Sequence, residues 1–130
     1  EFLENIENEN FLEFEQVYNE IYYGTLKSLV KKKLEKHNVI FDVDVEGGTK
    51  LKEFFKDSSL SVFVKTPTLN DLEKRLRDRD KDSEKSISER LNKAKKEIVK
   101  QDQFDEIIIN DDLKKSKEKA FHTVKDFLIK

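Results

Sequence analysis

The chain has 130 residues, which is enough for one domain with a single hydrophobic core. Charged residues make up 42% of the sequence, yet the net charge is only −2, so we expect neither a nucleic acid nor an acidic membrane as a partner. The absence of cysteine excludes disulfides, thiolate catalysis and zinc–thiolate sites. No apolar run has the length of a membrane span, and we therefore expect a cytoplasmic protein.

The N-terminal part of the chain is acidic and predicts short elements. Residues 1–8 favour a short helix. Residues 11–19 and 21–24 carry aromatic and β-branched side chains and predict two strands that form an antiparallel pair. Thr25 is a candidate N-cap for the helix that follows, which should end near Asn38.

Three later segments have the composition of buried strands. They are Val39–Val45, Leu60–Val64 and Glu106–Ile109. Gly47-Gly48 is expected to end the first of them before a helix begins. Because predicted helices alternate with these strands, the pattern indicates an α/β fold with a parallel sheet covered by helices.

The helices after the second buried strand have recognisable start signals. Thr68 and Asp71 fit a capping box at the start of one helix. The highly charged stretch 77–85 separates that helix from a longer one. Asn110 or Asp111 is expected to cap the last helix.

Polar residues follow the predicted strands at their carboxyl ends, where ligands of parallel sheets bind. These residues are Asp42 and Asp44, then Thr66 and Pro67, then Asn110. An aspartate at such a position can organise a Mg²⁺–phosphate site because Mg²⁺ prefers oxygen ligands. A strand end that has simply reached solvent would have the same sequence, so both interpretations stay open for the aspartates.

Four arginines, Arg75, Arg77, Arg79 and Arg90, lie in and around the charged stretch. Guanidinium groups match phosphate oxygens and stabilise the charge of a phosphoryl group in transfer. Acidic residues are interleaved with these arginines, so we expect at least one or two of the four to form ion pairs with carboxylates of the same helix instead.

Glu13, Tyr22, Tyr23 and Thr25 lie in the acidic N-terminal part. A single carboxylate can accept hydrogen bonds from both N1–H and the exocyclic amine of guanine, whereas adenine offers no such donor pair. Glu13 is therefore a candidate for guanine recognition, although one glutamate in a strand is a weak signal.

Taken in chain order, these segments resemble the guanylate kinase family, and the match keeps order and spacing over nearly all of the chain. The stretches that carry it are Phe11-Leu12-Glu13-Phe14, Tyr22-Tyr23-Gly24-Thr25, Asp42-Val43-Asp44-Val45-Glu46-Gly47, Pro67-Thr68-Leu69, Arg75-Leu76-Arg77-Asp78-Arg79-Asp80, Ser83-Glu84, Ile87, Arg90-Leu91, Phe104-Asp105 and Ile109-Asn110-Asp111-Asp112-Leu113. The resemblance implies a P-loop NTPase-like parallel sheet flanked by helices, incomplete at the N-terminus, with a small antiparallel GMP-binding subdomain. It implies a partial GMP-binding subdomain at 1–25 and a core α/β domain at 26–130, with a lid at 77–85.

The resemblance also implies a function, which is phosphoryl transfer from ATP to GMP with Mg²⁺ as the cofactor. It implies GMP binding by Glu13, Tyr23, Gly24, Thr25 and Asp44. It implies ATP binding by Arg75, Arg79 and Asn110. It implies catalysis by Arg79, Arg90 and Asp42, the last of which would contact the metal through water. The implied protein is a monomer or a homodimer.

The chain departs from the family pattern in two places. No stretch matches the phosphate-binding loop G-x-x-x-x-G-K-[ST], and the sequence contains no methionine and begins with Glu1, so we expect it to be the C-terminal two-thirds of such a kinase. Asp78 and Asp80 stand where glycines are usual in the family's lid.

The alternative function is that of the non-catalytic guanylate-kinase-like domains, which bind phosphorylated peptide partners. Such domains tend to lose the second strand-end acid and the lid arginines. The chain keeps Asp44, Arg79 and Arg90, which favours the enzyme.

Overall fold

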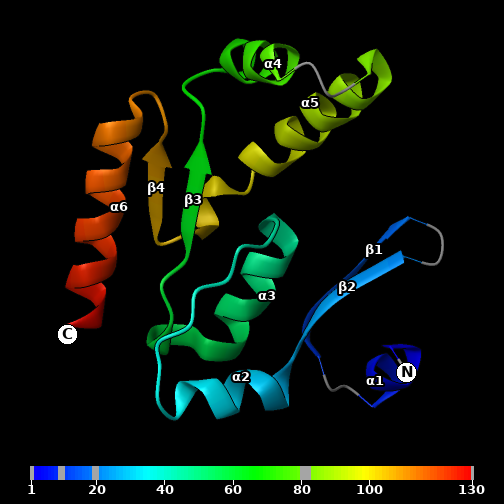
Figure 1. The fold of residues 1–130 in the computed structure, drawn as a ribbon, viewed down its shortest axis with the longest axis vertical. Coiled ribbons are helices and arrows are strands. Elements are labelled where there is room, and N and C mark those ends of the chain that lie inside the picture. The colour runs from blue at the N-terminus through cyan, green and yellow to red at the C-terminus, as the bar shows by residue number, and fades with distance from the viewer. Residues whose placement is uncertain (1, 9–10, 19–20, 80–82, 130) are drawn as a thin grey trace. The chain divides into compact units, whose positions relative to one another are not determined.

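The structure is a computed structural model, and its ribbon is drawn in Figure 1. It describes residues 2–8, 11–18, 21–79 and 83–129. The chain divides into two compact units, Glu1–Ser59 and Leu60–Lys130. None of the helices in the described part has the length and apolarity that a membrane span requires.

The N-terminal unit contains four helical elements and a hairpin. They are α1 (Phe2–Glu7), β1 (Phe11–Tyr18), β2 (Ile21–Leu26), α2 (Lys27–Leu34), α3 (Val45–Phe55) and the 3₁₀ turn η1 (Lys56–Ser58). The strands β1 and β2 pair antiparallel, which confirms the predicted pairing. Val30 of α2 and Leu51 of α3 are buried against each other, and Phe41 and Phe55 pack on them to form a small core.

The predicted strand Val39–Val45 is wrong. Residues 38–44 have no regular secondary structure, and α3 already begins at Val45. A strand needs a neighbouring strand that takes up its backbone N–H and C=O groups, and none of the described residues pairs with this segment in a sheet. Burial within the segment is uneven, since Ile40 is 86% exposed whereas Phe41 packs on the small core and Val45 is buried.

Two predicted element boundaries in this unit are also wrong. Gly47-Gly48 does not interrupt the chain but lies inside α3, because the side chain of Asp44 accepts a hydrogen bond from Gly47 N at 2.8 Å and caps the helix before the glycines. Thr25 belongs to β2, and α2 starts without a side-chain cap at Lys27 and ends at Leu34.

The C-terminal unit is a two-stranded parallel sheet with helices. Its elements are β3 (Val62–Lys65), α4 (Leu69–Asp78), α5 (Glu84–Ile98), the 3₁₀ turn η2 (Gln101–Gln103), β4 (Glu106–Ile109) and α6 (Leu113–Leu128). The register runs from Val62 opposite Glu106 to Lys65 opposite Ile109. Figure 1 shows β3 and β4 pointing the same way, with α6 alongside β4. The unit therefore has the predicted α/β character with parallel strands.

The core of this unit comes from alternate strand residues and the inner faces of two helices. The buried side chains are Phe63, Leu76, Ile87 and Ile108. The ring of Phe63 meets that of Phe104 edge-on at 5.4 Å between centroids. Because successive strand residues face opposite sides, Val64 and Ile109, which follow the buried strand residues, are exposed.

The two strands are held in register at their amino ends by one pair of residues. The carboxylate of Asp105 accepts hydrogen bonds from Ser61 N at 2.9 Å and from Ser61 Oγ at 3.1 Å. The backbone N–H of Asp105 in turn donates to Ser61 Oγ at 3.0 Å. Because these bonds fix the register at the amino ends, the strands stay paired up to their carboxyl ends, where the polar residues lie.

Helix starts in this unit agree with the prediction in one case and differ in the other. Thr68 caps α4 and accepts from Asp71 N at 3.1 Å, as predicted. The expectation that Asn110 or Asp111 caps α6 is wrong, because Asp112 accepts from the first backbone N–H groups of that helix. All three residues can cap helices, and only the one directly before Leu113 can reach those N–H groups.

We expect Ile108→Ala to lower the free energy of unfolding by about 2–5 kcal/mol, since it leaves a cavity in the core. Ile108 is 3% exposed, and its neighbour Ile109 is 50% exposed. Ile109→Ala is therefore the matched control and should cost well under half as much. Urea denaturation of both variants measures the difference, and equal losses would contradict this assignment of the core.

Candidate functional site

The carboxyl ends of β3 and β4 bring two of the predicted ATP-binding residues together. Asn110 directly follows β4, and its backbone N–H donates to Lys65 O at 2.7 Å, which extends the ladder by one bond. Arg75 reaches over from α4, and its Nη2 donates to the backbone carbonyl of Asn110 at 2.8 Å. This contact joins residues that are 35 positions apart and ties α4 to the loop after β4.

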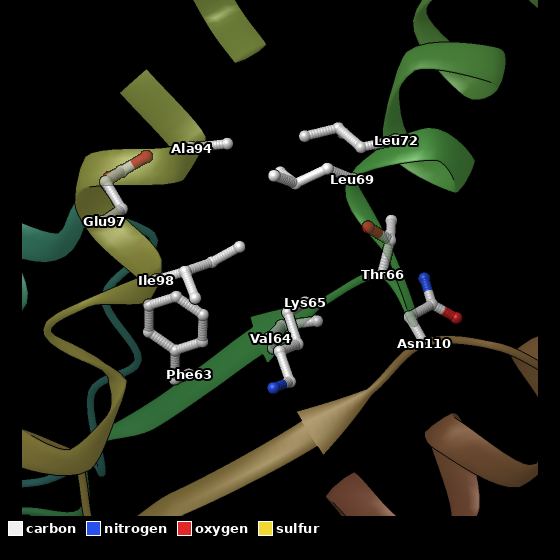
Figure 2. Close-up of a pocket in the computed structure, with 10 residues that line it drawn as sticks. All are labelled: Phe63, Val64, Lys65, Thr66, Leu69, Leu72, Ala94, Glu97, Ile98 and Asn110. Carbon is white, nitrogen blue, oxygen red and sulfur yellow. The ribbon is translucent and has the colours of Figure 1, made fainter. Parts of the chain in front are cut away.

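A pocket of about 240 Å³ opens beside this junction (Figure 2). It is lined by Phe63, Val64, Lys65, Thr66, Leu69, Leu72, Ala94, Glu97, Ile98 and Asn110. Most of its lining residues are apolar, and its polar residues are Thr66 and Asn110 on one side together with the charged residues Lys65 and Glu97 (Figure 2). Thr66 Oγ1 donates to Thr68 O at 2.9 Å, so the hydroxyl oxygen keeps its capacity to accept. Apolar walls with few polar groups are typical of small-molecule sites.

Arg77 is held by acidic residues, and the sequence indicated such pairing for at least one or two of the four arginines. Arg77 pairs through Nη1 with Glu84 of α5, and its Nη2 lies 3.3 Å from Glu73 Oε1 one turn earlier on α4. The paired guanidinium lowers the pKa of the Glu84 carboxyl below its usual range, mainly through the hydrogen bond, and the pKa of Arg77 is raised by the same contact. Arg77 thus links α4 to the first turn of α5.

The other two arginines lie on the exposed surface of the same unit. Arg79 is the C-cap residue of α4, and Arg90 lies in α5. Both side chains are exposed. The structure therefore places them where a ligand can reach them, and their predicted role in phosphate binding stays a prediction.

The two aspartates after the expected strand have different surroundings. Asp42 is exposed in the irregular segment before α3. Asp44 is half-buried, and its carboxylate accepts from Gly47 N as the cap of α3. Both residues belong to the N-terminal unit, which is described separately from the unit with Arg75 and Asn110, so the predicted convergence of the four residues stays a prediction.

The predicted GMP-binding residues of the hairpin are described by their backbone alone. Glu13 lies opposite Thr25 in the register, Phe14 opposite Gly24, and Glu15 opposite Tyr23. The candidate residues Glu13, Tyr23, Gly24 and Thr25 therefore occupy neighbouring positions on one hairpin. Their role in binding GMP stays a prediction.

The sequence reasoning missed one residue at the strand ends, which is Ser116. Its hydroxyl lies 3.0 Å from Asn110 Oδ1, and it also contacts Leu113 O at 3.1 Å. A serine in the first turn of a helix is ordinarily assigned to capping or to solvent. Its position could have indicated this contact, because Ser116 lies one turn into α6, shortly after the turn formed by residues 110–112.

Comparison with known proteins gives a single consistent result. The sequence profile of one protein family, described as guanylate kinase, matches residues 1–130. The guanylate kinase of Bacteroides thetaiotaomicron is 45% identical over 131 residues, which cover 100% of this chain and 64% of that protein. The guanylate kinase of Porphyromonas gingivalis is 42% identical over 131 residues, which cover 100% of this chain and 70% of that protein.

A solved structure has the same fold. The crystal structure of guanylate kinase from Anaplasma phagocytophilum superposes with a TM-score of 0.77 at 21% sequence identity, and the superposition covers 99% of this chain and 62% of that one. The chain thus spans slightly less than two thirds of the Bacteroides protein and of the Anaplasma chain.

The pairing of Arg77 with Glu84 predicts a pH-dependent contact. Because the pKa of Glu84 is lowered in the folded protein, the pair stabilises the fold above the ordinary glutamate pKa, and this contribution disappears as the pH falls through the lowered value. In Arg77→Gln the pKa of Glu84 should return to its usual range. Carboxyl-carbon NMR titration measures it, with Lys74→Gln on the same helix as the control. An unchanged Glu84 pKa in Arg77→Gln would contradict the pairing.

Proposed function

The chain belongs to the guanylate kinase family, and on that premise we propose that the protein transfers the terminal phosphoryl group of ATP to GMP, giving ADP and GDP. The observation that carries the proposal is the family match over residues 1–130, since this range includes every residue that we assign to the site. Because the relatives are longer than the chain, the proposal concerns the protein encoded by the whole reading frame that contains it. The alternative of a non-catalytic phosphopeptide-binding domain receives no support from these relatives.

On the ATP side we assign Arg75, Arg79 and Asn110. The hydrogen bond between Arg75 and the Asn110 carbonyl supports this assignment, because it places two of the three at one end of the sheet. Arg79 and Arg90 carry exposed guanidinium groups, which can neutralise charge that builds on the phosphoryl oxygens during in-line transfer. In such a reaction positioning and charge stabilisation supply the catalysis, and no covalent protein intermediate is needed.

On the GMP side we assign Glu13, Tyr23, Gly24, Thr25 and Asp44. Neighbouring register positions of the hairpin support a joint role for the first four. The Glu13 carboxylate would accept from N1–H and the exocyclic amine of guanine, and the hydroxyl of Tyr23 would donate to the phosphate of GMP. In line with these roles, we propose a partial GMP-binding subdomain at 1–25 and a core α/β domain at 26–130.

Mg²⁺ is the cofactor that we propose, with Asp42 as its contact through water. The described residues contain no group of three or more His, Cys, Asp or Glu side chains that could hold a metal. Mg²⁺ keeps several waters in protein sites and is bound by one or two carboxylates together with substrate phosphates. The exposed carboxylate of Asp42 fits that pattern. When bound, the ion would neutralise negative charge on the phosphates of the substrate.

The remaining proposals concern the lid, the location of the protein in the cell and its oligomeric state. We assign residues 77–85 to a lid, of which 80–82 lie outside the described residues. We also propose that the protein is cytoplasmic and that it is a monomer or a homodimer.

The first test is substrate selectivity. We expect the protein encoded by the whole reading frame to bind GMP more tightly than AMP by at least about tenfold, because only guanine offers the donor pair that a carboxylate accepts. Calorimetric titration with each nucleotide measures the two affinities. Equal affinities, or no binding of GMP, would count against the proposed function.

The second test concerns Glu13. Glu13→Gln should raise KM for GMP by about ten- to a hundredfold, since the charge-assisted hydrogen bonds to guanine are weakened. KM for ATP should stay within twofold or so of the original value. Steady-state kinetics with each substrate varied in turn measures both constants, and an unchanged KM for GMP would reject this role.

A further inference from the structure

The last turn of α4 and the first turn of α5 lie outside the core of the C-terminal unit. Leu76 of α4 and Ile87 of α5 are buried, and they anchor the bodies of the two helices. Residues 77–79, which follow the first anchor, and residues 83–85, which precede the second, are exposed. Buried apolar side chains of these described residues therefore do not set the position of one turn relative to the other.

Arg77 joins the two exposed turns through an ion pair. Its Nη1 donates to Glu84 Oε1 in the first turn of α5, and its Nη2 lies 3.3 Å from Glu73 Oε1 on its own helix. The two acids hold different nitrogens of one guanidinium group, whose donors have a fixed fork geometry. Glu73 thus orients the guanidinium on α4, and Glu84 connects it to the next helix. The lowered pKa of the Glu84 carboxyl agrees with this contact.

Arg79 and Arg90 are each attached to one of the joined turns. The backbone N–H of Arg79 donates to Arg75 O at 3.2 Å, so Arg79 continues the helical geometry beyond Arg77. Arg90 lies in α5, about 9 Å further along the helix axis than Glu84. A contact that fixes Arg77 relative to Glu84 therefore also fixes the backbone of Arg79 relative to that of Arg90.

We propose that Arg77 and Glu84 are positioning residues: their ion pair holds the last turn of α4 against the first turn of α5 and so sets the spacing of Arg79 and Arg90 for phosphoryl transfer. This inference rests on the proposed function, because it takes Arg79 and Arg90 as the groups that neutralise charge on the phosphoryl oxygens. Arg77 and Glu84 act through them and do not contact the substrate. Exposed ion pairs are weak, so the effect of losing this one is about two- to fivefold.

Glutamate variants of the protein encoded by the whole reading frame test this role, because each acid can be removed separately. Glu84→Gln should lower kcat about two- to fivefold and leave KM for GMP within about twofold. Glu73→Gln keeps the connection between the helices and should leave kcat nearly unchanged. Glu89→Gln is the matched control, since Glu89 is another exposed acid of α5. An unchanged kcat in Glu84→Gln, or equal losses in Glu73→Gln and Glu84→Gln, overturns the proposal.

A double-mutant cycle distinguishes the ion pair from a direct role of Arg77. Arg77→Gln should lower kcat by the same factor as Glu84→Gln, and the double variant should be no slower than either, because all three lose one and the same contact. If Arg77 itself bound the phosphates, Glu84→Gln would release its guanidinium without lowering kcat, and the proposal would be wrong. Added salt should lower kcat of the unchanged protein, at saturating substrates, more than that of Glu84→Gln, because it screens the pair.

Hydrogen exchange of the Arg79 amide measures the joining of the turns independently of turnover. Glu84→Gln should speed this exchange about two- to fivefold, and Glu89→Gln should leave it unchanged. Unchanged exchange in Glu84→Gln would show that the pair does not hold the turns together and would overturn the proposal. A protein that transfers no phosphoryl group would refute the proposed function, whereas transfer with an unchanged kcat in Glu84→Gln would refute the positioning role alone.

Discussion

The short parallel ladder between β3 and β4 is the constraint on which the proposed ATP side depends. It is pinned at the amino ends by the reciprocal bonds of Ser61 and Asp105 and is extended at the carboxyl ends by the bond from Asn110 N to Lys65 O. Only because that end is fixed can Arg75 reach the Asn110 carbonyl from α4. The position of Asn110 therefore depends on backbone pairing, and Arg75 is joined to it by a hydrogen bond to its carbonyl.

The arginines of this unit differ in their surroundings. Arg77 is paired with acids on both adjoining helices, and Arg75 donates to a backbone carbonyl at the sheet end. Arg79 and Arg90 lie on exposed surface. A cluster of four similar residues in the sequence thus contains at least two different roles, which spacing alone does not separate.

Local signals in the sequence predicted the C-terminal unit well. The strand Glu106–Ile109 was predicted with its observed bounds, because a run of isoleucines is enclosed by Asp105 and Asn110. The segment Val39–Val45 was misassigned, since a strand depends on a partner that composition does not reveal. The contacts of Asn110 with Arg75 and with Ser116 could not be predicted, because both require the turn geometry before α6. Parallel-sheet topology indicated the edge at which Asn110 lies, but not which atoms meet there.

The central claim is that the junction of Arg75 and Asn110 forms the ATP side of a nucleotide site. The most direct measurement is an NMR titration of the ¹⁵N-labelled protein with ATP and Mg²⁺, following the side-chain amide of Asn110 and the Nε–H of Arg75. We expect both signals to shift in a saturable way, while the side-chain amide of Gln103, at the amino end of β4, stays in place. Saturation with ATP while the signals of Asn110 and Arg75 remain unmoved would contradict the account.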